Sequence, residues 1–271
     1  MIKINDYVVE QNKYPDGSWL LNNIPHTFER FNYSIELDWR YEGEHELSLL
    51  IYLAKYVKDM YPKTSLILKV LYVPNSRGDR VYNKSEVFVL KYFSEIINSL
   101  NFSQVIVMDV HSNVTNALIN NISERPLIEL KELIKNYTNI YFPDEGAQKR
   151  YSKILDLTGK CVYTGMKRRN WNTGKIEGLD IFFTNDSSDK SSILMIDDIC
   201  SYGGTFYFSA DKLKNIGFDI IDAYCTHAEP VVNNSESNIQ KAFSIGLINK
   251  LYTTDTLLQE TKSENIIIKH V

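Results

Sequence analysis

The sequence predicts an α/β fold with two doubly wound domains and mainly parallel sheets. Three observations predict it. Strand-like and helix-like segments alternate, apolar runs end in polar clusters, and 271 residues allow two cores at about 150 residues per domain. We expect an N-terminal domain over 1–137 and a C-terminal domain over 138–256. The remaining tail, 257–271, is expected to pack back on the first domain.

The first half of the chain contains two apolar runs that predict buried strands, at 66–73 and 105–108. Apolar residues at helical spacing precede the first run, over 47–57, and follow it, over 87–100. This strand–helix–strand order is typical of βαβ units in a parallel sheet.

The second half repeats the alternation. Its predicted elements are a helix over 127–134, strands over 139–142 and 193–196, a helix ending near 213, and a strand over 218–225. In doubly wound sheets, ligands bind beyond the carboxyl ends of the strands. The polar clusters that follow these strands are therefore the first places to look for a site.

The composition is that of a folded protein, with 44% hydrophobic residues, 24% charged residues and a net charge of −4. An acidic balance argues against a nucleic-acid partner. No apolar run is long enough to span a membrane, and the N-terminus does not resemble a secretory leader. Cys161, Cys200 and Cys225 lack metal-ligand or disulfide spacing, which fits a reducing cytoplasm.

The strongest motif covers 193–205, where an apolar strand delivers Asp197 and Asp198 and a turn with Gly203 and Gly204 opens a helix. Backbone N–H groups and the helix N-terminus can cradle a phosphate, and two acids beside them can hold sugar hydroxyls or a metal. The alternative is an acid pair that only caps the helix. The sequence contains no P-loop motif, so ATP would have to bind through another kind of motif.

This segment resembles the ribose-5-phosphate loop of the phosphoribosyl pyrophosphate (PRPP) synthetases, which type I phosphoribosyltransferases share. Five further segments match the synthetases in order, so the resemblance implies two phosphoribosyltransferase-like domains. It also implies that Asp197 and Asp198 hold the ribose 2- and 3-hydroxyls and a metal. The residues implied to bind the ribose and its 5-phosphate are Asp197, Asp198, Ser201, Tyr202, Gly203, Gly204 and Thr205.

Two segments resemble the ATP-binding parts of the family. The letters Y-P-D-G-S from Tyr14 are similar to F-P-D-G-E, which implies that Tyr14 and Asp16 reach the ATP site of a neighbouring subunit in a homo-oligomer. The letters Y-V-P-N-S-R-G-D-R from Tyr72 are similar to Y-x-P-Y-A-R-Q-D-R, which implies that Arg77 and Asp79 hold ATP. Taken alone, these segments are an ordinary turn and a solvated charged loop.

Three further matches imply the metal and catalytic residues. D-V-H at 109–111 resembles D-L-H and nominates His111 as an ATP-binding residue and a ligand of Mg²⁺, while Asp144 matches a second metal carboxylate. K-R-R from Lys167 resembles a flexible catalytic loop, which makes Lys167 and Arg169 the catalytic candidates and 166–174 a mobile lid. Without the resemblance, a lone histidine is more often structural and adjacent cations are more often solvated.

The resemblance implies Mg²⁺-dependent transfer of the diphosphate of ATP to the anomeric hydroxyl of ribose 5-phosphate, with release of AMP. Ser201 and Tyr202 stand where the family has Asp and Thr, which suggests a second acceptor, a larger 5-substituted ribose such as ADP-ribose. The rivals are a phosphoribosyltransferase and a non-catalytic regulatory relative. Thr226–Ala228 and 251–256 resemble structural landmarks of the family.

Overall fold

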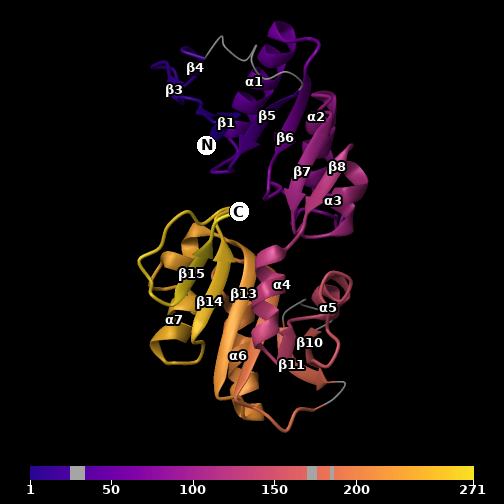
Figure 1. The fold of residues 1–271 in the computed structure, drawn as a ribbon, viewed down its shortest axis with the longest axis vertical. Coiled ribbons are helices and arrows are strands. Elements are labelled where there is room, and N and C mark those ends of the chain that lie inside the picture. The colour runs from indigo at the N-terminus through magenta and orange to yellow at the C-terminus, as the bar shows by residue number, and fades with distance from the viewer. Residues whose placement is uncertain (25–33, 170–175, 184–185) are drawn as a thin grey trace. The chain divides into compact units, whose positions relative to one another are not determined.

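A computed structural model describes residues 1–24, 34–169, 176–183 and 186–271 (Figure 1). The chain divides into two compact units, Met1–Pro126 and Leu127–Val271. Helix α4 (Ile128–Leu133) and the short helix η2 (Ile134–Asn136) therefore lie in the second unit, although we expected the first domain to extend to residue 137.

The first unit is built on a six-stranded sheet in the order β2-β1-β5-β6-β7-β8. Strands β5 to β8 are parallel, and β1 runs antiparallel to both β2 and β5. The two buried strands predicted in this half are β6 and β7. The strand bounds are β1 Ile2–Ile4, β2 Tyr7–Val8, β5 Ser34–Trp39, β6 Ser65–Lys69, β7 Gln104–Met108 and β8 Ile122–Arg125.

Both long helices of this unit share one core with one face of the sheet. Helices α1 (Glu46–Met60) and α2 (Val89–Ser99) bury apolar stripes against alternate residues of the strands, while α3 (Asn113–Leu118) is short. Because β5, β6, β7 and β8 follow one another in one direction across the sheet, right-handed crossovers place α1 and α2 on the same side.

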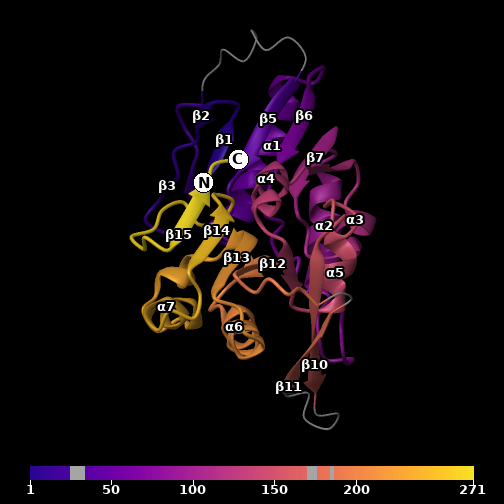
Figure 2. The same ribbon diagram turned by 60° about the horizontal axis from the view of Figure 1, so that its bottom comes forward.

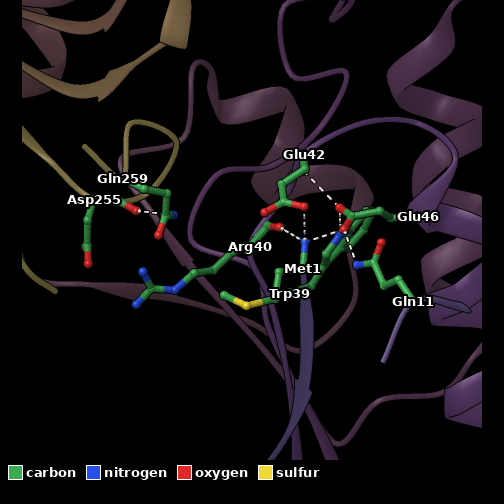
Figure 3. Close-up of polar contacts among 8 residues, drawn as sticks. All are labelled: Met1, Gln11, Trp39, Arg40, Glu42, Glu46, Asp255 and Gln259. Carbon is green, nitrogen blue, oxygen red and sulfur yellow. Dashed lines mark hydrogen bonds and ion pairs between the residues drawn. The ribbon is translucent and has the colours of Figure 1, made fainter. Parts of the chain in front are cut away.

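A buried carboxylate anchors the start of α1. The Met1 ammonium group is ion-paired with Glu46 and donates to the Arg40 carbonyl oxygen over 2.7 Å (Figure 3). Glu46 is fully buried and also accepts hydrogen bonds of 2.9 Å from the Trp39 indole and the Gln11 amide. A buried charge is tolerated only when it is paired in this way, so this cluster fixes β1 against α1.

The second unit is built on a seven-stranded sheet in the order β11-β10-β9-β12-β13-β14-β15, which is parallel apart from β11. The segment 257–271, expected to be a tail, contributes the edge strand β15 of this sheet. The strand bounds are β9 Asn139–Phe142, β10 Cys161–Arg169, β11 Ile176–Phe183, β12 Ser192–Cys200, β13 Ile220–Ala228, β14 Lys250–Thr254 and β15 Ile266–Lys269.

Helices cover both faces of this second sheet. Helices α6 (Gly204–Ile216) and α7 (Asn238–Ser244) share a core with one face, and η3 (Pro230–Asn233) lies between β13 and α7. On the other face, Tyr151 of α5 (Glu145–Tyr151) stacks on Phe142 with ring centroids 6.0 Å apart. The direction of winding reverses between β9 and β12, which is the switch point where such sheets bind ligands.

The two units together confirm the predicted α/β class with mainly parallel sheets. Within the described parts of the chain, no helix combines the length and the apolar character needed to cross a membrane.

Candidate active site

Three carboxylates gather at the switch point of the second sheet. Asp144 follows β9 after one residue, Asp197 and Asp198 lie near the carboxyl end of β12, and these strands are neighbours in the sheet. Burial raises the pKa of the Tyr141 phenol to about 12, and the negative charges of Asp144 and Asp197 add to that shift. Asp144 and Asp197 are 53 residues apart along the chain, yet both raise the pKa of the same hydroxyl group.

Arg150 offsets the charge of the acid pair. Its Nη2 lies 3.0 Å from Asp198 Oδ1 and 4.0 Å from Asp197 Oδ1. Burial raises the pKa of Asp197 well above its usual range, and the adjacent charge of Asp198 adds to this effect. The two carboxylates therefore lie beside the Arg150 cation at a site with limited access to solvent. Carboxylates with such shifted pKa values are common at functional sites.

The phosphate-loop candidate, 201–205, is held against the start of α7. Gly203 has φ +81°, and a Cβ there would lie 2.7 Å from Ile239 Cβ and 2.9 Å from the Ile239 nitrogen. The Ile239 N–H also donates to the Tyr202 carbonyl oxygen over 3.1 Å. Only glycine fits this position, and α6 begins directly after it, with N–H groups in its first turn that suit an anion.

The loop presents a large aromatic side chain to solvent. Tyr202 is 58% exposed, whereas Ser201 and Thr205 are half-buried. The ring therefore lies outside the core and beside the N-terminus of α6, where it is accessible to a bound ligand.

Asp144 has a local structural role as well as its place at the switch point. It is the N-cap of α5, and its Oδ1 accepts a hydrogen bond of 3.0 Å from the Ala147 N–H. The alternative considered for the acid pair was that it only caps the next helix. Asp144 has such a capping role, whereas Asp197 and Asp198 lie within β12.

The segment that carries Lys167 and Arg169 is part of a strand. We expected a mobile lid over 166–174, but residues up to Arg169 belong to β10, which pairs with β11 as a hairpin (Figure 2). The register shifts between Arg168 and Arg169. Residues 170–175, with the Gly174 of the expected lid, lie outside the described residues.

In the first unit, the ATP-site candidates follow two adjacent strands. The segment 70–80 follows β6 and the segment 109–112 follows β7. The Met108 N–H donates to the Leu71 carbonyl oxygen over 3.0 Å, which joins the first segment to the end of β7. The pKa of Asp79 is lowered, chiefly by hydrogen bonds from Arg80 and further by the charge of His111. His111 is therefore close enough to Asp79 to act on its carboxylate, while the ATP-binding roles of both residues stay predictions.

Asp79 is turned toward its neighbour in the chain. Its carboxylate accepts 2.7 Å and 2.9 Å hydrogen bonds from Nε and Nη2 of Arg80 and is only 5% exposed. Arg77 and Arg80 are the exposed residues of the loop 70–80. Sequence reasoning assigned a role to Arg77 and Asp79 but none to Arg80, although its place beside an acid was visible in the motif.

Tyr14 and Asp16 lie in a tight turn between β3 (Asn12–Lys13) and β4 (Trp19–Leu20). Asp16 accepts hydrogen bonds from the Ser18 N–H and hydroxyl at 3.0 Å and 2.7 Å, which lower its pKa. Ser18, which replaces the Glu of the similar family motif, thus stabilises the turn. The Tyr14 ring is exposed.

The two landmark segments near the end of the chain form a buried polar network. His227 Nδ1 lies 2.8 Å from Thr256 Oγ1, and the Thr254 hydroxyl donates to the Thr226 carbonyl oxygen over 2.7 Å. These side chains are inaccessible to solvent, which agrees with a structural function.

Comparisons with known proteins connect this fold and site with one class of enzyme. No protein-family model matches the chain. A ribose-phosphate pyrophosphokinase of Methanothermobacter thermautotrophicus is 23% identical over 266 residues, which cover 95% of this chain and 88% of that protein. One from Pyrococcus abyssi is 24% identical over 267 residues, which cover 96% and 87%.

The solved phosphoribosylpyrophosphate synthetase of Mycobacterium smegmatis has the same fold, with a TM-score of 0.75, 12% identity, and coverage of 97% of this chain and 86% of that one. Fold and relatives define a two-domain protein of the phosphoribosyltransferase-like α/β class. Within that class, the chain is similar over nearly its whole length to ribose-phosphate pyrophosphokinases, and identities of 23% and 24% make it a divergent relative of them.

Proposed function

We propose that the chain transfers the diphosphoryl group of ATP to the anomeric hydroxyl of ribose 5-phosphate, which makes PRPP and AMP. The hydroxyl oxygen forms a bond to the β-phosphorus, and the bond from that phosphorus to the α–β bridging oxygen breaks. AMP leaves with the electron pair, and the hydroxyl proton passes to solvent. The observation that carries the proposal is the acid pair Asp197 and Asp198 next to the N-terminus of α6, in a chain related to enzymes named for this reaction.

The ribose would bind at the end of β12. Asp197 and Asp198 would accept hydrogen bonds from the 2- and 3-hydroxyls, and Arg150 pairs with Asp198 beside them. The 5-phosphate would bind to the loop 201–205 and to the first N–H groups of α6. Holding both ends of the sugar fixes the anomeric hydroxyl in one orientation, which is the main contribution that positioning makes to such a transfer.

ATP would bind to the first unit through the loop that follows β6. Arg77 and Arg80 present guanidinium groups, which match phosphate oxygens, and Asp79 holds Arg80 in place. Tyr14 and Asp16 would complete the ATP site of a second copy, so we propose a homo-oligomer. We place the reaction in the cytoplasm, in agreement with three cysteines that lack disulfide spacing.

The residues present are suited to a magnesium ion that is bound together with ATP. The described residues contain no group of three or more side chains able to hold a metal by themselves. Mg²⁺ is usually held by one or two carboxylates together with substrate phosphates, and Asp144 and Asp197 lie near one hydroxyl group. We propose that Asp144 and His111 each help to hold a magnesium ion, which would neutralise charge on the transferred group.

Lys167 and Arg169 would neutralise charge on the diphosphoryl group in the transition state. The test is AMP release by Lys167→Ala, with Lys153→Ala as the control because Lys153 is an exposed lysine of the same unit. We expect Lys167→Ala to lower kcat by about two to three orders of magnitude with unchanged thermal unfolding. Near-normal turnover would reject the role of Lys167.

A second acceptor, ADP-ribose, is favoured by one observation. Tyr202, where the family has a small Thr, projects an exposed ring beside the phosphate loop, and an aromatic ring there can stack on an adenine base. Tyr202→Ala should then raise KM for ADP-ribose about tenfold, by loss of stacking, and leave KM for ribose 5-phosphate nearly unchanged. Equal effects on the two acceptors, or better wild-type turnover of ribose 5-phosphate, would argue against this specialisation.

A further inference from the structure

Strand β10 approaches its neighbours unusually closely at Gly165. A Cβ at this position would lie 2.7 Å from the Pro143 carbonyl oxygen, 3.1 Å from Leu179 Cδ1, and closer still to the Tyr141 hydroxyl oxygen. Real Cβ atoms do not approach backbone oxygens below about 3 Å, so a side chain at 165 would force β10 or its neighbours to move. The φ angle of Gly165 is not among the positive ones, and the requirement for glycine is therefore one of space.

Tyr141, the main contact of Gly165, joins several elements. The residue is fully buried in β9, and its hydroxyl lies 2.9 Å from the Ser209 hydroxyl of α6. On the other side of Gly165, the Thr164 hydroxyl donates to Gln148 of α5 over 2.9 Å. The hydroxyl of Tyr141 thus occupies the space beside Gly165 and is itself fixed by the helix that begins at the phosphate loop.

This contact lies next to the candidate site. Pro143 directly precedes Asp144, and both Asp144 and Asp197 influence the Tyr141 phenol electrostatically. Gly165 also stands two positions before Lys167 in the same strand. A change in the separation of β10 and β9 at this point would therefore move the segment that carries Lys167 relative to the carboxylates.

We propose that Gly165 and the Tyr141 hydroxyl are a matched pair of positioning residues, which together set the distance between β10 and the Pro143–Asp144 turn and so place Lys167 for diphosphoryl transfer. The proposal rests on the proposed function. A displacement of about 1 Å at a reacting group can lower a rate about a hundredfold, so small changes here have large effects.

The experiment compares Gly165→Ala, Tyr141→Phe and the double variant with the wild type in AMP release and in thermal unfolding. Phe182→Ala is the control because Phe182 lies in β11, the other neighbour of β10, and its side chain is exposed. We expect Gly165→Ala to lower kcat at least about tenfold while KM for ATP and for ribose 5-phosphate changes less than about twofold, which is the signature of lost transition-state positioning. Phe182→Ala should stay within about threefold of wild type, whereas Tyr141→Phe should lower kcat about threefold to tenfold because the spacing loses its hydroxyl contact.

The double variant decides whether the two residues act as a pair. Removal of the hydroxyl relieves the closest contact, although the Pro143 carbonyl remains, so Tyr141→Phe/Gly165→Ala should recover part of kcat and of the melting temperature lost in Gly165→Ala. Should Gly165→Ala fail to fold, a folded and active double variant still supports the pairing. Additive effects in the double variant, or normal kcat in a folded Gly165→Ala, would overturn it.

The same experiment separates failure of this inference from failure of the proposed function. A wild-type protein that releases no AMP rejects the function. The pairing is then judged by melting temperature alone, where non-additive effects of the two substitutions support it and additive effects reject it.

Discussion

Arg150 donates a hydrogen bond to Asp198 over 3.0 Å and thereby joins helix α5 to the end of strand β12. Asp198 is 3% exposed, and the guanidinium carbon of Arg150 lies 5.0 Å from the centre of the Tyr151 ring. The acid pair of the candidate ribose site therefore has a permanent positive partner, the guanidinium group of Arg150.

The first prediction concerns this ion pair. Arg150→Gln leaves Asp198 buried without its positive partner and should lower the free energy of unfolding by about 3 kcal/mol, measured by denaturant titration. Arg150→Lys keeps the charge but not the planar fork, and should lose about half as much. Equal stability of Arg150→Gln and the wild type would show that the contact does not stabilise the fold.

The second prediction concerns the two glycines at the ends of α6. Gly203 and Gly217 both have positive φ, but a Cβ at Gly217 would meet nothing within 4 Å, whereas one at Gly203 would meet Ile239. Gly217→Ala should cost about 1 kcal/mol of stability through φ alone, and Gly203→Ala about 3 kcal/mol because overpacking adds to it. Chemical denaturation of both variants measures the difference, and equal losses would contradict the packing of the phosphate loop against α7.

The third prediction is a pH dependence that arises from Glu46. Burial raises the pKa of this carboxyl, but hydrogen bonds from the Met1 ammonium group and from other donors outweigh burial, so the net shift is below the usual 4.5. A lowered pKa in the folded state stabilises the protein above the unfolded value and loses that effect as the pH falls through the folded value.

Glu46→Gln should therefore reduce the free energy of unfolding by about 2 kcal/mol at pH 7, and the difference from wild type should shrink as the pH falls below about 4.5. Glu95→Gln is the control, because Glu95 is exposed and its ion pair with Lys91 is long, at 3.9 Å. A difference that stays constant from pH 7 to pH 3 would contradict the assignment.

Local sequence patterns were sufficient to predict the strands that carry the site. The apolar runs at 66–73, 105–108 and 193–196 all contain or overlap observed strands, because a buried parallel strand needs a short, continuous apolar segment. The polar residues after them lie at strand ends for the same reason. The fold class follows from the alternation of such runs with helical periodicity.

Contacts between distant segments were not predictable in the same way. Nothing in the sequence near Arg150 indicates Asp198, and no local pattern shows that the Tyr141 hydroxyl fills the space above Gly165. The lid expected at 166–174 begins instead as strand β10, because pairing with β11 satisfies backbone groups of a segment whose composition alone suggests a loop. Strand β15 was missed because its apolar run, 266–268, is only three residues long and shows no alternation.

The most direct test of the central claim is the identity of the nucleotide and sugar products when wild-type protein is incubated with Mg-ATP and either ribose 5-phosphate or ADP-ribose, followed by chromatography and mass spectrometry. The account predicts that AMP forms and ADP does not. The amount of AMP should equal the amount of acceptor that has gained a diphosphate. The acceptor should be ribose 5-phosphate or, if Tyr202 marks a changed pocket, ADP-ribose. Release of ADP, or no AMP with either acceptor, would contradict diphosphoryl transfer by this chain.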